Sequence, residues 1–129
     1  MGVWVASEAV RIGNCSGFYG DRMSAMGEML AGGELDYLTG DYLAELTMLI
    51  LARDRARNAD LGYAKTFLRQ LENNLGLAMD RGVKIVANAG GLNPAGLAAA
   101  QPAPILDAAA ACPSTLPAHA LSSARSWLS

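Results

Sequence analysis

The sequence has few of the residues that build disulfide frameworks, zinc sites or basic nucleic-acid surfaces. It contains two cysteines and one histidine in 129 residues, and no CxxC or Cys/His spacing typical of zinc. Lys and Arg (10) are outnumbered by Asp and Glu (12), which gives a formal net charge of -2. Nucleic-acid binding usually needs clustered positive charge. We therefore expect no nucleic-acid partner and no metal, and the scarcity of cysteine favours a reducing compartment.

Long hydrophobic runs are also missing. The longest, at 46–52, is too short to cross a bilayer. The N-terminal segment has no basic start and reaches Glu8 before its apolar run attains the length of a signal peptide. We therefore expect a cytoplasmic protein without a membrane segment. With 52% hydrophobic residues, the chain is long enough for one modest domain and too short for two.

The expected elements alternate between strands and helices. Short apolar or β-branched runs bounded by turn formers predict strands at 10–13, 35–38 and 83–89. Helical spacing of apolar residues predicts helices at 23–30, 41–57 and 63–80, and Asn93-Pro94 opens another. This order predicts an α/β fold, a partial parallel sheet of about three strands flanked by helices.

The helix at 41–57 has the clearest sequence features. Thr39 or Asp41 can cap its first turn, and three arginines lie near its negative end, where positive charge is favourable. Its middle, LTMLILA, is apolar nearly all round, so we expect this helix to be buried on several sides.

The composition changes after Gly96 to mostly alanine, proline and serine, and four of the five prolines follow this point. We therefore predict a domain at 1–97 and a weakly structured tail at 98–129, with at most a short helix near 107–111.

Polar side chains follow each predicted strand. In a parallel sheet the loops after the strands meet at one edge, where α/β proteins bind ligands. For binding a small molecule, the candidates are Asn14, Ser16, Arg22, Asn88 and Asn93. As catalytic groups, the candidates are Asp21 and Asp41. The alternative is that all seven serve only turns and helix caps.

The glycine-rich segment at 10–22, VRIGNCSGFYGDR, matches no standard motif. Its glycine spacing fits neither GxGxxG nor a phosphate-binding loop, so turn geometry is favoured over an anion-binding nest. Cys15 and Ser16 are the candidate nucleophiles in this loop, but the sole histidine, His119, lies in the predicted tail. In the segment 13–17, GNCSG, the serine stands one position later than the GxSxG nucleophile elbow requires. Cys15 is therefore better interpreted as a small buried hydrophobe.

Asp41 and Glu45 are four residues apart and would share a helical face. Such a pair could hold a divalent metal, and Asp21 could complete a carboxylate cluster. Compensation of the helix dipole is the simpler explanation.

Four separated blocks resemble, in order, the N-terminal domain of the acyclic terpene utilisation family: RIGNCSGFYGDR, LDYLTGDYLAELTMLILAR, YAKTFLRQLE and KIVANAGGLNP. The resemblance covers about residues 10–96. It implies the N-terminal portion of a longer protein with a part in bacterial breakdown of citronellol- and geraniol-type terpenes, and it names no cofactor.

Three functional expectations follow from the residues and the resemblance together. The first is a protein that binds a polar or acyl-thioester intermediate, or acts on it by hydration, lyase or proton-transfer chemistry. The second is a non-catalytic binding or assembly module. The third is an inactive truncated or frameshifted product, whose unpaired sheet edge and exposed 41–57 helix would favour self-association or a protein partner.

Overall fold

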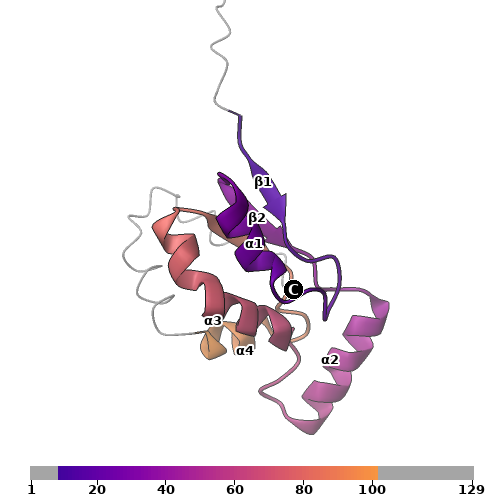
Figure 1. The fold of residues 1–129 in the computed structure, drawn as a ribbon. Helices are drawn as coiled ribbons and strands as arrows, with labels where there is room; N and C mark the ends of the chain where they lie inside the picture. The colour runs from indigo at the N-terminus through magenta and orange to yellow at the C-terminus, as the bar shows by residue number, and fades with distance from the viewer. Residues whose placement is uncertain (1–8, 102–129) are drawn as a thin grey trace, which may run out of the picture.

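The computed structural model describes residues 9–101, which form a parallel sheet with helices (Figure 1). The strands are β1 (Ile12–Asn14), β2 (Tyr37–Gly40) and β3 (Lys84–Ala87). The helices are α1 (Ala25–Gly32), α2 (Glu45–Arg57), α3 (Lys65–Asp80) and α4 (Pro94–Ala100). The predicted α/β class and three-stranded parallel sheet are confirmed. Residues 98–100 complete α4 and Gln101 is its C-cap, whereas the remainder of the predicted tail, 102–129 including 107–111, lies outside the described residues.

The sheet has the order β1-β2-β3, with β2 in the centre. Gly13 pairs with Leu38, which in turn pairs with Ile85. Right-handed crossovers that advance in one direction place their helices on the same face of a sheet. In agreement, α1 and α3 pack side by side (Figure 1).

The core lies between this helix pair and the sheet. Met26 and Leu30 of α1, Leu38 of β2, and Phe67 and Leu71 of α3 are buried in one cluster. Burying a side chain of this size contributes roughly 1.5–3 kcal/mol. The position of β1 relative to α1, and hence of the loop between them, depends on this cluster.

The opposite face of the sheet is open in the described range. Ile12 and Val86, which point away from the core, are 65% and 55% exposed. On the same face, the ammonium of Lys84 lies 5.4 Å from the centre of the Tyr37 ring. Parallel sheets are usually covered on both faces. The described residues therefore supply one of the two layers expected around such a sheet.

The start of α2 corrects one prediction, because the helix begins at Glu45, not at Asp41. The Asp41 carboxylate accepts hydrogen bonds from the backbone N–H of Leu43 (3.2 Å) and from the Asn88 amide (2.6 Å), and residues 41–44 lie before the helix. Neither Thr39 nor Asp41 caps the helix, whose N-cap is Ala44 without a side-chain bond.

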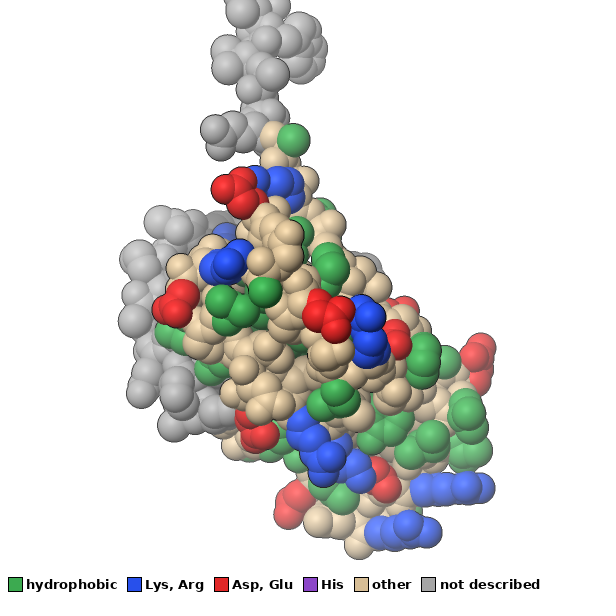
Figure 2. Space-filling model, viewed as in Figure 1, with side chains coloured by type: hydrophobic (Ala, Val, Ile, Leu, Met, Phe, Trp, Pro, Cys, Tyr) green, Lys and Arg blue, Asp and Glu red, His purple; other side chains and the backbone are tan. Residues whose placement is uncertain are grey.

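The predicted burial of α2 on several sides is also wrong. Thr47 and Leu51 are its buried residues, whereas Leu46 is 69% exposed. Leu51 packs against the backbone near Gly91. Apolar side chains are visible on the surface where α2 lies (Figure 2). None of the described helices has the length and hydropathy needed to span a bilayer.

Candidate functional site

A hollow of about 320 Å³ lies between the loop that follows β1 and the first turns of α1. Four of the predicted site residues line it, and they are Asn14, Ser16, Asp21 and Arg22. The remaining lining is contributed by Cys15, Gly17, Ala25 and Met29. The structure therefore brings together the polar groups that follow β1 at the carboxyl edge of the sheet.

Hydrogen bonds inside the loop fix these groups. The Asp21 carboxylate accepts from the backbone N–H of Gly17 (2.9 Å) and of Arg22 (2.7 Å). The Asn14 amide donates to the carbonyl of Ser16 (3.0 Å), and the Ser16 hydroxyl donates to the carbonyl of Phe18 (3.1 Å). The loop is therefore held in one conformation largely by its own polar side chains.

Asp21 is an ionised acceptor at neutral pH. The N–H groups of Gly17 and Arg22 stabilise its charged form and lower its pKa below the usual range. Because two bonds do not saturate a carboxylate, Asp21 can still accept a hydrogen bond from a ligand. Its neighbour Arg22 is exposed and pairs with Glu28 at 2.8 Å, a solvent-screened contact that a ligand anion can replace.

Asp41 and Asn88 form a second polar pair beside the loop. The Asn88 amide donates to Asp41 and its oxygen accepts from the backbone N–H of Tyr42 (2.8 Å). Two hydrogen bonds lower the pKa of Asp41: the one from the Asn88 amide has the larger effect, and the one from the backbone N–H of Leu43 the smaller. The backbone N–H of Asp41 donates to the carbonyl of Ser16 (2.9 Å), which joins the pair to the first loop. Neither Asp41 nor Asn88 lines the hollow.

Asn93 is not brought together with the other candidates. Its oxygen accepts from the backbone N–H of Gly96 (2.9 Å), so it caps α4. Its nitrogen donates to the carbonyls of residues 59–61, the closest being Leu61 at 3.0 Å. In this structure the Asn93 side chain joins the connection between α2 and α3 to the start of α4.

Comparison with known proteins agrees with the sequence blocks that cover this site. Residues 10–108 match the model of the family described as acyclic terpene utilisation family protein AtuA. The chain belongs to this family. The match begins where the four blocks begin and extends beyond Gly96, and it connects the chain with acyclic terpene utilisation. No curated protein and no solved structure matches the chain.

In this member of the acyclic terpene utilisation family, the expected carboxylate pair of Asp41 and Glu45 does not share a helical face. Asp41 precedes α2, and its Oδ1 accepts hydrogen bonds from the backbone N–H of Leu43 and from the Asn88 amide. Within residues 9–101, no three His, Cys, Asp or Glu side chains are grouped so that they could hold a metal ion.

Sequence reasoning missed a buried polar pair beneath the hollow. The Tyr42 hydroxyl donates to the oxygen of Gln70 (2.6 Å), and both side chains are almost completely buried. The Gln70 nitrogen reaches the carbonyls of Arg22 (3.3 Å) and Met23 (3.4 Å), so α3 supports the end of the loop. The sequence feature that could have revealed this pair is Gln70, a polar residue next to Leu71 on the apolar side of α3.

The buried interpretation of Cys15 is confirmed, because its side chain is 4% exposed. Burial raises the pKa of the Cys15 thiol, although a hydrogen bond with Tyr42 acts in the opposite direction. A protonated thiol is a poor nucleophile. Cys15 therefore contributes shape to the hollow more than reactivity.

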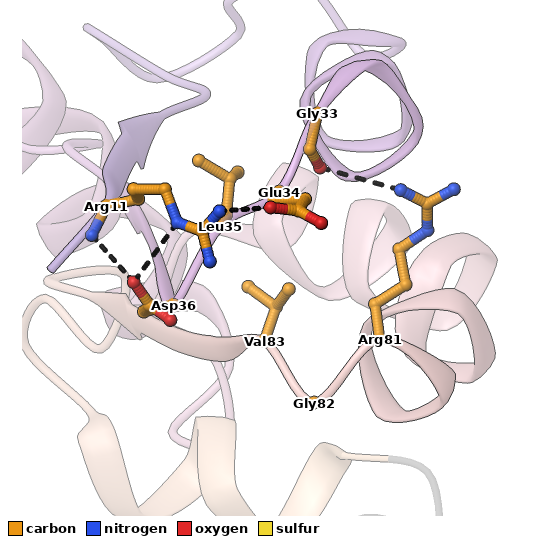
Figure 3. A pocket seen from close by; sticks show the side chains of 8 residues that line it. All are labelled: Arg11, Gly33, Glu34, Leu35, Asp36, Arg81, Gly82 and Val83. Atoms are coloured by element: carbon orange, nitrogen blue, oxygen red, sulfur yellow. Dashed lines mark hydrogen bonds and ion pairs between the residues drawn. The ribbon is translucent and has the colours of Figure 1, made fainter. Parts of the chain in front are cut away.

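A second hollow, of about 370 Å³, lies at the amino ends of the strands (Figure 3). Arg11 forms ion pairs with Glu34 and Asp36 there, and Arg81 donates to the carbonyl of Gly33 (3.5 Å). These charges largely neutralise each other. Because parallel α/β proteins bind ligands at the carboxyl ends of strands, the hollow after β1 is the stronger candidate.

Proposed function

We propose that the chain is the N-terminal, ligand-binding portion of an acyclic terpene utilisation protein. The ligand would be a polar or acyl-thioester intermediate of citronellol- or geraniol-type terpene breakdown, bound in the hollow after β1. The supporting observation is that Asn14, Ser16, Asp21 and Arg22 line one hollow at the carboxyl edge of the sheet.

The composition of the hollow supports a ligand with both polar and apolar parts. Arg22 and Asp21 offer a cation and an acceptor, whereas Ala25 and Met29 of α1 offer an apolar wall. A branched hydrocarbon chain with a polar or thioester end has matching chemistry. The volume of about 320 Å³ lies at the lower end of the range of small-molecule sites.

A catalytic role, by hydration, lyase or proton-transfer chemistry, is the second candidate. Its support is that the Asp21 carboxylate lines the hollow and that Asp41 is joined to the same loop. However, a general base works best with a pKa near the working pH, and both carboxylates have lowered pKa values. The lowered pKa values therefore favour binding over proton transfer.

The test is isothermal titration of the full chain with the geranoyl thioester of coenzyme A. We expect saturable binding that Arg22→Ala weakens at least tenfold, because a charged hydrogen bond contributes roughly 1.5–3 kcal/mol. Arg81→Ala, which removes an exposed arginine from the opposite hollow, is the matched control and should bind normally.

Mass analysis of the incubated thioester then separates the two candidates. Unchanged thioester after saturable binding supports a binding module. Conversion that Asp21→Asn abolishes supports catalysis. Absence of binding by a cooperatively melting sample, or equal losses in the Arg22 and Arg81 variants, would refute a ligand site in this hollow.

A further inference from the structure

The exposed side of α2 carries an apolar stripe that the described residues leave uncovered. Leu46 and Leu49 are 69% and 49% exposed, although leucines on an amphipathic helix normally face a core. The closely packed element pairs in residues 9–101 are β1 with β2, β2 with β3, and α1 with α3, and α2 belongs to none of them. Figure 2 shows apolar side chains on the surface where Figure 1 places α2, next to basic ones.

Opposite charges flank this stripe. Glu45, Leu49 and Arg53 are spaced by four residues and therefore lie along one ridge of the helix. Glu45 and Arg53 are exposed, and neither forms an ion pair with another residue in the range 9–101. The ridge thus changes from negative to apolar to positive along the helix.

A surface with this pattern is complementary to a copy of itself turned end to end. If Leu49 lies on a twofold axis between two antiparallel helices, Glu45 of each protomer lies opposite Arg53 of the partner subunit. A parallel arrangement would place like charges together, which is unfavourable. Twofold pairing of one patch with itself is also the commonest geometry of homodimers.

We propose that a second copy of this chain covers the stripe, through antiparallel pairing of α2 around Leu49. The open face of the sheet is the competing surface, since Ile12 and Val86 are also exposed. The charged side chain that strand β3 places on this open face is Lys84. A copy of the face would bring a second lysine and no opposite charge to pair with it. The charge pattern therefore favours α2.

This inference goes beyond ligand binding and does not rest on it, because no residue of α2 lines the hollow after β1. Loss of dimerisation can therefore be observed without loss of ligand binding.

The test is sedimentation velocity of the full chain over a wide concentration range at low salt. We expect a monomer–dimer equilibrium that Leu49→Glu weakens at least tenfold, because it places two like charges at the axis. Met79→Glu is the matched control, since Met79 is an apolar residue of α3 that is 51% exposed. It should dimerise normally, and thermal melting monitored by circular dichroism confirms that each variant is folded.

Charge exchange tests the orientation of the helices. Arg53→Glu should weaken the dimer, and adding Glu45→Arg to the same chain should restore it, because the two charges are then exchanged in both protomers. A folded sample that stays monomeric throughout would overturn the proposal. Dimerisation that resists Leu49→Glu but is lost in Ile12→Thr would overturn it too and place the interface on the sheet.

Discussion

Tyr42 and Gln70 connect the core to the loop that carries the candidate ligand groups. Tyr42 is 1% exposed, and its ring meets Phe67 edge to face with 5.5 Å between centres. Its hydroxyl and the Gln70 amide form a short chain of hydrogen bonds that ends on the carbonyls of Arg22 and Met23. Buried polar groups of this kind are costly when one partner is removed.

Tyr42→Phe is therefore expected to lower the free energy of unfolding by about 1–3 kcal/mol, because the buried oxygen of Gln70 loses its donor. Urea denaturation measures the change. Tyr37→Phe is the matched control, since Tyr37 lies on the open face of the sheet and keeps its contact with Lys84 without the hydroxyl. Equal stabilities for the two variants would show that the Tyr42–Gln70 bond contributes little.

For single residues, the sequence predicts the polar groups that follow β1 but not the buried side chains that hold their loop in place. Asp21 and Arg22 could be predicted because they follow a recognisable strand and turn. Gln70 could not, because its role depends on Tyr42 and on the Arg22 carbonyl, which lie 28 and 48 residues away in the chain. Asn93 was placed with the ligand groups because residue type alone does not distinguish a helix cap from a binding group.

Among the helices, α1 and α3 make the close contact on which the core depends. Gly27 of α1 faces Asn74 of α3, and a methyl group at Gly27 would come within 2.6 Å of the Asn74 side-chain oxygen. The Asn74 nitrogen is held by the carbonyl of Gln70 (2.7 Å). By contrast, a methyl group at Gly76, also within α3, would meet nothing within 4 Å.

Two glycine-to-alanine variants separate helix propensity from packing. Gly76→Ala is expected to raise the free energy of unfolding by roughly 0.5–1 kcal/mol, because alanine loses less backbone entropy than glycine in a helix. Gly27→Ala has the same intrinsic gain but forces Asn74 to move, so we expect it to be about 1 kcal/mol less stable than Gly76→Ala. Chemical denaturation compares them, and equal gains would contradict a tight contact between α1 and α3.

The elements themselves were largely predictable, and their surroundings were not. Each observed helix and strand overlaps a predicted one, since periodicity and glycine turns are local signals. The start of α2 was misplaced because Asp41 bonds to Asn88, a residue distant in the sequence. Its burial was overestimated because an apolar helix surface does not reveal whether the chain provides a partner for it.

For the whole molecule, charge sets the pH range of stability. Hydrogen bonds lower the pKa values of Asp21, Asp36 and Asp41 in the folded state, whereas burial raises those of Cys15 and Tyr42. Lowered carboxyl pKa values stabilise the fold above about pH 4, and this contribution is lost as the pH falls through the folded values. Raised thiol and phenol pKa values stabilise it below about pH 8.5, and this is lost as the pH rises.

We therefore expect the urea midpoint to be highest between about pH 5 and pH 8 and to fall on both sides. The midpoint of Asp21→Asn should approach that of the unmodified chain only as the pH falls through the lowered folded-state pKa of Asp21, because the aspartate is uncharged below that pKa, as asparagine is at every pH. A midpoint that stays constant from neutral pH down to about pH 2.5 would contradict the lowered carboxyl pKa values.

The hollow after β1 has one further property, which is its continuity in the chain. All of its lining residues lie between Asn14 and Met29, in a single strand, loop and helix. Later segments support this unit through Thr39, Asp41 and Gln70 but add no lining group. Ligand preference can therefore diverge by substitutions in this one segment while α2 and its partner surface stay unchanged, so that recognition and assembly can evolve independently in the same chain.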